Sequence, residues 1–231
     1  MKYLIISVVV LLSLFLVVGI IYLPKYFPVA EISCNSLNSP CSEELQSKIK
    51  DLKGKNWQTV RTKVVSLVDN DPEIKEYSIR FKLPNTMEVY LVENKALYAI
   101  HFPENNIFYL INNQGTIIKI TGGNNLPYID YSDKLPNVGE KIDEKLIFAL
   151  QTVSPIYYSY QVKSAIVANG NLNIILSSGL TVIFPLEGDQ KALLGSFKLI
   201  IDHLEMNKLD NADNLGKISV VDLRFKNPVL K

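Results

Sequence analysis

The longest apolar run in the chain extends from Tyr3 to Leu23 and contains neither a charged residue nor a proline. A helix of this run is roughly 31 Å long, which matches the hydrocarbon thickness of a bilayer. The run exceeds the apolar part of a signal peptide, about 7–15 residues, and no small-x-small cleavage site follows it. We therefore expect residues 3–23 to form an uncleaved transmembrane helix, with residues 1–2 as a cytoplasmic stub.

After this run, the hydrophobic period changes in the order strand, helix, helix, strand, strand. The first strand is expected from Val29 to about Cys34, and the segments SEELQSKIKDLKG and WQTVRTKVVSLVDND then place apolar residues at helical spacing. Two alternating runs, Ile74–Leu83 and Met87–Glu93, meet at the turn sequence LPNT and predict a β-hairpin. The pattern predicts a first domain over residues 24–95.

The rest of the chain, residues 96–231, shows short strands separated by turn signals. IFYLINNQGTIIKIT predicts a hairpin, and YQVKSAIVANGNLNIILSSGLTVIFP predicts a three-stranded meander with turns at Asn-Gly-Asn and Ser-Gly. Helices are expected at roughly Asp143–Val153 and at Gln190–Asn207. The overall expectation is an α+β fold, whose second domain is a mainly antiparallel β domain with two helices.

The chain ends on ISVVDLRFKNPVLK, which predicts one continuous strand. Strict alternation places one set of residues, Val221, Leu223 and Phe225, on one face of that strand. The other face carries Ile218, Val220, Asp222 and Arg224. Both faces are partly apolar, so we expect the strand to pack on a helix and also to meet something else.

Composition and motifs argue against several functions. The net charge of +1 gives no signal for nucleic acid, whose binding proteins are usually markedly basic. The chain lacks the motifs GxSxG, HExxH, GxGxxG and the P-loop. His203 adjoins Asp202, but adjacent helical residues do not share a face, and His101 is expected at a loop or strand end. We expect no enzymatic activity, metal, cofactor or small-molecule substrate.

Two cysteines, Cys34 and Cys41 in CNSLNSPC, are candidates for a small disulfide loop of the kind that forms in oxidising compartments. Two unpaired thiols are the alternative, and the sequence leaves the choice open. Lys2 and Lys25 flank the apolar run and give weak guidance on orientation. Because so few residues precede the anchor, we expect a single-pass type II protein of the cytoplasmic membrane with its large domain extracytoplasmic.

Several short sequences, taken in order, resemble the FtsQ/DivIB family of bacterial cell-division proteins over nearly the whole chain. LKGKNW resembles the family's Gly-Lys-Asn-aromatic step between two helices, YLINNQG is similar to its Tyr-Leu-Ile-Asp-x-x-Gly hairpin, and VVDLRFKNPVLK resembles its Asp-Leu-Arg-aromatic strand. Within DPEIKEYSIRFKLPNTMEVYLVE, the matching positions are Pro72, Pro84, Asn85, Thr86 and Glu93.

The resemblance implies a POTRA domain at residues 24–95 and a second domain at 96–231 that binds FtsB (or DivIC) and FtsL. It implies a non-enzymatic divisome scaffold at the division septum that is needed for septum formation and regulates septal peptidoglycan synthesis. We expect the partner-binding residues to be Asp222, Arg224, Phe225 and Lys226, at the edge where a partner strand docks.

Two other interpretations remain open from the sequence. The C-terminal segment is alternatively a plain core strand in which Arg224 pairs with Asp222. The whole protein is alternatively a membrane-anchored POTRA-type protein in secretion or envelope assembly that binds polypeptides by β-augmentation. A membrane-anchored enzyme is disfavoured, because the sequence shows no set of nucleophile, general base and general acid.

Overall fold

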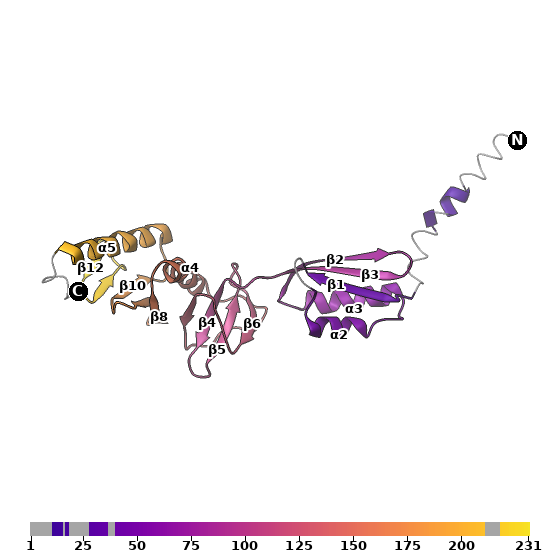
Figure 1. The fold of residues 1–231 in the computed structure, drawn as a ribbon, viewed down its shortest axis with the longest axis horizontal. Helices are drawn as coiled ribbons and strands as arrows, with labels where there is room; N and C mark the ends of the chain where they lie inside the picture. Colours follow the sequence, from indigo (N-terminus) through magenta and orange to yellow (C-terminus); the bar gives the residue numbers. More distant parts are fainter. Residues whose placement is uncertain (1–10, 16, 19–27, 37–39, 211–217) are drawn as a thin grey trace, which may run out of the picture. The chain divides into compact units, whose positions relative to one another are not determined.

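The computed structural model describes residues 11–15, 17–18, 28–36, 40–210 and 218–231, with the backbone alone at 205–210. The chain divides into two compact units, Met1–Asn94 and Lys95–Lys231, which are drawn in Figure 1. Most of the expected transmembrane helix at residues 3–23 lies outside the described residues, although 11–15 and 17–18 are helical. Over the described residues, no helix is long and apolar enough to cross a membrane.

Unit 1 contains the predicted order of strand, helix, helix, strand, strand. Its elements are β1 (Glu31–Ser36), α2 (Glu43–Lys50), α3 (Trp57–Asp69), β2 (Ile74–Lys82) and β3 (Thr86–Glu93). The sheet order is β1-β3-β2, with β1 parallel and β2 antiparallel to the central strand β3. Met87, Val89 and Leu91 of β3 are buried with Ile49 of α2 and Val64 of α3, so both helices cover one face of the sheet (Figure 1).

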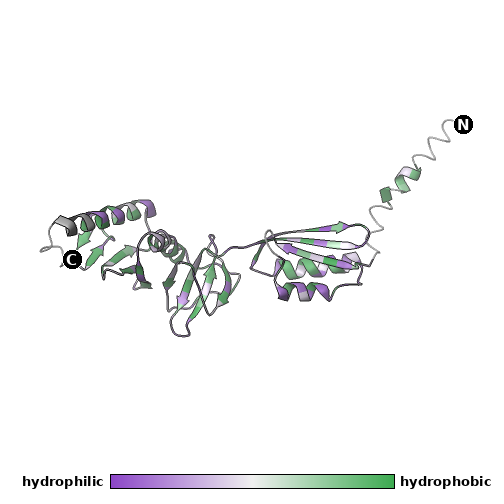
Figure 2. Cartoon of the chain, in the orientation of Figure 1, coloured by the Kyte–Doolittle hydropathy of each residue, from purple (hydrophilic) through white to green (hydrophobic). Residues whose placement is uncertain are grey.

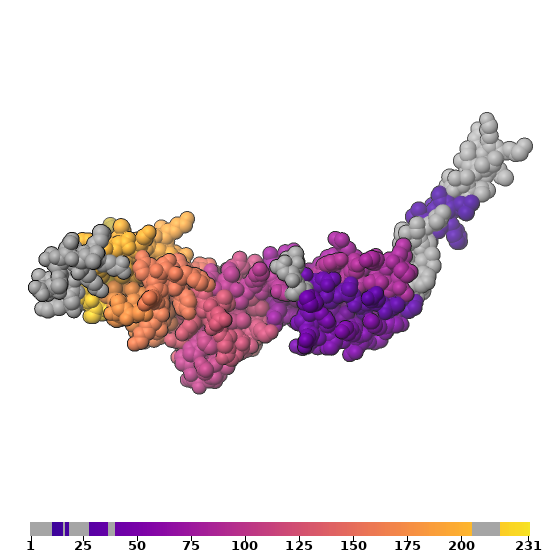
Figure 3. Space-filling model, viewed as in Figure 1, coloured from indigo at the N-terminus to yellow at the C-terminus, as the bar shows by residue number. Residues whose placement is uncertain are grey.

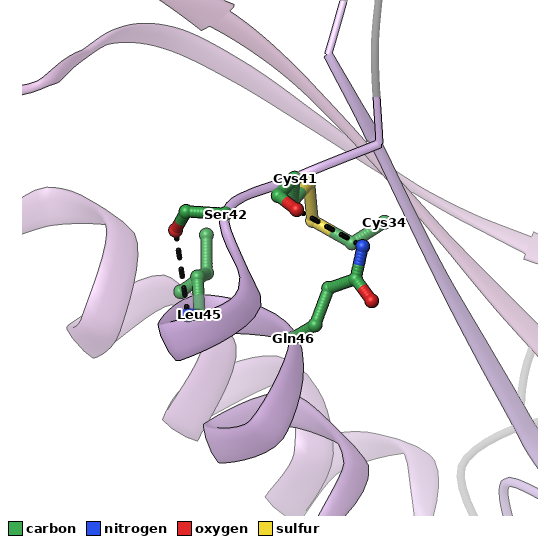
Figure 4. Close-up of a disulfide and its surroundings, with 5 residues drawn as sticks. All are labelled: Cys34, Cys41, Ser42, Leu45 and Gln46. Carbon is green, nitrogen blue, oxygen red and sulfur yellow. Dashed lines mark hydrogen bonds between the residues drawn. A yellow bond between two sulfur atoms is a disulfide. The ribbon is translucent and has the colours of Figure 1, made fainter.

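A disulfide closes the connection between β1 and α2. It joins Cys34 to Cys41 across a Cα–Cα distance of 5.5 Å (Figure 4). The Gln46 side-chain amide donates a hydrogen bond to the Cys41 carbonyl at 2.9 Å, and the Ser42 hydroxyl accepts one from the Leu45 amide at 3.4 Å (Figure 4). The bridge therefore lies directly against the N-terminal cap of α2.

Unit 2 is built on a nine-stranded sheet of order β12-β11-β10-β9-β8-β7-β4-β5-β6. Its strands are β4 (Tyr98–Phe102), β5 (Ile107–Ile111), β6 (Ile117–Thr121), β7 (Tyr128–Asp130), β8 (Val162–Ala168), β9 (Asn171–Leu176), β10 (Thr181–Pro185), β11 (Val220–Asp222) and β12 (Val229–Leu230). Its helices are α4 (Glu144–Ser159) and α5 (Gln190–Asp210). Antiparallel pairs predominate, and the α+β expectation is confirmed.

One core unites this sheet with both helices. Alternate strand residues, such as Ile100, Ile174 and Phe184, are buried with Leu150 of α4 and Phe197 of α5. Figure 2 shows hydrophilic and hydrophobic residues alternating along strands of both units, as expected of sheets with one buried face.

Two features of unit 2 differ from the predictions. The strands β4 and β7, in the interior of the sheet, lie in segments for which no strand was expected. Helix α4 continues past the expected end near Val153 to Ser159, although Pro155 lacks an amide hydrogen. The helix continues because Val153 and Ile156 on either side of the proline are almost fully buried in the core.

Candidate partner-binding site

The C-terminal segment forms two short strands joined by a bend. β11 ends at Asp222 and pairs in parallel with β10, and β12 folds back antiparallel on β11. The prediction of one continuous strand is therefore wrong. Leu223 and Phe225 do not share a face, because Leu223 is 3% exposed and Phe225 is 57% exposed.

The chain leaves the strand where Asp222 binds Arg224. The carboxylate of Asp222 accepts hydrogen bonds from the Arg224 backbone amide at 3.2 Å, from Nε at 2.8 Å and from Nη2 at 2.6 Å. A side chain that binds the backbone two residues onward offers the chain an alternative to a strand ladder. The hydrogen bonds from Arg224 hold the pKa of the Asp222 carboxyl below its usual value, and Asp222 raises the pKa of Arg224.

This pairing separates the roles of the expected site residues. Asp222 is fully buried and cannot touch a partner directly, so its part in the site is to hold Arg224. The guanidinium of Arg224 also lies 5.7 Å from the centre of the Phe225 ring, within cation–π range. Phe225 and Lys226 are exposed in the bend, so the surface that Arg224, Phe225 and Lys226 offer is a bend rather than a strand edge.

A hollow of about 280 Å³ opens beside this bend. Its walls come from the end of β10, the first turns of α5 and the bend. In Figure 3 the yellow C-terminal residues lie next to the orange and gold residues of β10 and α5. The lining residues are Pro185, Glu187, Gly188, Asp189, Ala192, Leu193, Ser196, Leu223, Arg224, Phe225, Lys226 and Pro228.

The hollow combines apolar surface with charges of both signs. Asp189 is the N-terminal cap of α5, since its Oδ1 accepts from the amides of Lys191 at 2.9 Å and Ala192 at 3.1 Å. Glu187 adds a second carboxylate to the lining, and Arg224 and Lys226 of the bend add positive charge. Such a lining suits a polypeptide segment with an apolar anchor and flanking charges.

The edge of the sheet next to the hollow is β12. Val220 and Lys231 exchange a pair of backbone hydrogen bonds at 2.9 and 3.0 Å. In an antiparallel pair such bonded residues alternate with residues whose amide and carbonyl face outward, so those groups of Leu230 face away from β11. Val229 and Leu230 are 37% and 45% exposed, and β12 has no neighbour on its outer side in the described part of the chain.

Sequence reasoning missed the wall of the hollow formed by Glu187 and Asp189. The available signal was EGDQ before the second helix of unit 2, in which Asp189 is a typical N-cap. It also missed the surroundings of His101, which lies in β4 and bonds Asp130 at 2.7 Å and Asn106 at 3.0 Å. Among the described residues, no group of three or more His, Cys, Asp and Glu could hold a metal ion.

The matched family accounts for unit 2. A family model described as cell division protein FtsQ/DivIB, C-terminal, matches residues 101–224. The match covers more than half of the chain, includes Asp222 and ends at Arg224, immediately before Phe225. No curated protein matches the chain. From the family model, the chain belongs to the FtsQ/DivIB family of cell division proteins.

Proposed function

We propose that this protein is a non-enzymatic scaffold of the bacterial divisome. Residues 3–23 anchor it in the cytoplasmic membrane, and both units lie outside the cytoplasm at the division septum. Unit 2 holds FtsB/DivIC-like and FtsL-like proteins, and the assembled complex regulates septal peptidoglycan synthesis. The observation that carries the proposal is the hollow beside Phe225, in a unit whose family is that of a cell division protein. The hollow lies next to the edge of β12 that no described residue pairs with.

The geometry supports a definite mode of binding. A partner strand adds to β12 by main-chain hydrogen bonds with Leu230, and a side chain from that partner enters the hollow. Phe225 is the aromatic anchor of the contact, and Lys226 and the half-exposed Arg224 attract acidic residues of the partner. Asp222 acts only by holding Arg224 in place.

Two features of unit 1 support the same arrangement. Its β-α-α-β-β order is that of a POTRA domain. The Cys34–Cys41 disulfide supports an extracytoplasmic location, because disulfides persist in oxidising compartments and are rare in the cytosol.

The site is tested by measuring affinity for the FtsB/DivIC-like and FtsL-like proteins of the same organism. Phe225→Ala should weaken binding by about 30-fold, the loss typical of an interface hot spot. Tyr158→Ala is the matched control, because Tyr158 is a 70% exposed aromatic residue of the same unit outside the hollow. Truncation after Leu223 removes the bend and β12 and should abolish binding. Unchanged affinity in the truncated chain contradicts the site.

The cellular role is tested separately with a fluorescent fusion. A divisome scaffold gathers at midcell in dividing cells. A uniform distribution around the envelope contradicts the division role and favours a POTRA-type protein of secretion or envelope assembly.

A further inference from the structure

The residues that follow the apolar N-terminal segment enter unit 1 between two loops. The Val29 amide donates to the Lys55 carbonyl and the Gly54 amide donates to the Val29 carbonyl, both at 2.9 Å. The Ala30 amide donates to the Asn85 carbonyl at 2.9 Å. The α2–α3 loop and the β2–β3 turn therefore lie at the same end of unit 1. We call this surface, residues 53–55 and 83–85, the entry end.

The arrangement of the sheet separates the entry end from the rest of the unit. β1 runs parallel to β3 with Glu31 opposite Thr86, so both strands start at the entry end (Figure 1). β3 then runs from Thr86 to Glu93, a length of about 24 Å at 3.4 Å per residue. Glu93 thus marks the far end of unit 1.

The tip of the entry end carries an exposed leucine. Leu83 is 80% exposed, more than any other large hydrophobic side chain described outside the N-terminal apolar segment; Leu199 follows at 73%. A single exposed hydrophobic residue is ordinary on a protein surface. Leu83 differs from an ordinary exposed residue because it lies beside the chain entry and close to a positively charged loop.

The neighbouring loop carries positive charge. Lys53 and Lys55 flank Gly54 and are both exposed. Within the described part of the chain, neither ammonium has a carboxylate within ion-pair distance. Lysines near an anionic lipid surface favour contact with it by about fivefold each. A leucine beside two unpaired lysines is the combination that partitions into the headgroup region of a membrane.

The covalent chain limits how far the entry end lies from the expected anchor. Leu23 ends the apolar run and Pro28 begins the described part of unit 1, five residues later. Five residues span at most about 18 Å even when fully extended. The entry end is therefore always within reach of the membrane surface that holds the anchor.

We propose that the entry end of unit 1 docks on the lipid surface, with Leu83 among the acyl-chain ends and Lys53 and Lys55 on anionic headgroups. The proposal rests on the membrane anchoring included in the proposed function. It gives unit 1 a fixed end on the bilayer rather than a free tether.

The depth of residue 83 is measured on the full chain inserted in vesicles of neutral and anionic phospholipid. Leu83→Trp is made on a Trp57→Phe background, which leaves one tryptophan, and lipids brominated along the acyl chain serve as quenchers. We expect strong quenching at position 83. The matched control is Glu93→Trp at the far end of unit 1, where we expect none. Replacing Lys53 and Lys55 with Gln should lower the equilibrium constant for docking of unit 1 about 25-fold, because each lysine contributes a factor of about five.

A second measurement uses the unaltered chain and so does not depend on how a variant folds. Acylation of lysines by a water-soluble reagent, read by mass spectrometry, should be slower at Lys53 and Lys55 in anionic vesicles than in neutral ones. Lys75, at the start of β2 and hence at the far end, should react equally in both. The docking is overturned if each of the three lysines reacts equally fast in anionic and neutral vesicles, or if residue 83 is not quenched.

Vesicle flotation separates this result from failure of the proposed function. A chain that floats with vesicles but shows no quenching at residue 83 is anchored without docking. A chain that does not float contradicts the anchor itself, and with it the membrane arrangement of the proposed function.

Discussion

Removal of the Cys34–Cys41 disulfide should lower the free energy of unfolding of unit 1 by about 2.5 kcal/mol. The two cysteines are 7 apart in sequence. Closing so short a loop of about eight residues removes roughly 8 cal/mol/K of entropy from the unfolded chain, which corresponds to about 2.5 kcal/mol at 25 °C. Small units have total stabilities of only about 5–10 kcal/mol, so the bridge accounts for a large share.

The protein contains a built-in reporter for this measurement. Trp57 is the one tryptophan of the chain. It lies at the start of α3, in unit 1, with its ring 5.0 Å from that of Phe81 in β2. Its fluorescence therefore follows the unfolding of unit 1 and not that of unit 2. For a small unit with a urea dependence of about 1 kcal/mol/M, the unfolding midpoint should fall by about 2.5 M.

The comparison needs the double variant Cys34→Ala/Cys41→Ala and the unaltered chain, both as full chains in detergent micelles. Dithiothreitol should lower the midpoint of the unaltered chain to that of the variant and leave the variant unchanged. If the oxidised chain and the variant unfold at the same urea concentration, the reasoning from loop closure is wrong.

Two further predictions concern unit 2. The pKa of Asp222 is lowered in the folded protein, so the stabilisation from its bonds to Arg224 is present above the ordinary pKa and is lost as pH falls through the lower folded value. The difference in melting temperature between the unaltered chain and Asp222→Asn should therefore shrink between pH 7 and about pH 3, and a constant difference would contradict this. Gly115→Ala should destabilise unit 2 by about 2 kcal/mol, because φ is +81° and the new Cβ would clash with Ile147. Gly122→Ala is the control, because a Cβ at this position meets open space. Calorimetry should show a lower melting temperature for Gly115→Ala and an unchanged one for Gly122→Ala.

Local patterns predicted the helices of unit 1 well. The helical spacing in SEELQSKIKDLKG predicted α2, and in the structure Ser42 caps this helix while Leu45 and Ile49 are its buried residues. In α3, Val60 and Val64 are fully buried as the spacing indicated. These signals are readable because a cap and an i, i+4 stripe involve residues of the same helix.

The interior of the unit 2 sheet was not readable in this way. β7 spans only Tyr128–Asp130, too few residues to show an alternating period. It is a strand because it pairs in parallel with β4 on one side and with β8 on the other. Such pairing depends on segments about 30 residues or more away, which no local window contains.

By itself, the sequence determined the order of elements in unit 1, the α+β class and the family, because these depend on local spacing and on short sequence marks. Only the tertiary structure decided how the chain ends. The alternation of ISVVDLRF favoured a strand through Phe225, but burial of Asp222 requires its carboxylate to be bonded. Arg224 supplies those bonds and takes the chain out of the strand. The candidate site is therefore a bend beside a hollow. Hydrogen bonds to the buried Asp222 carboxylate stabilise this bend more than continuing the strand through Phe225 would.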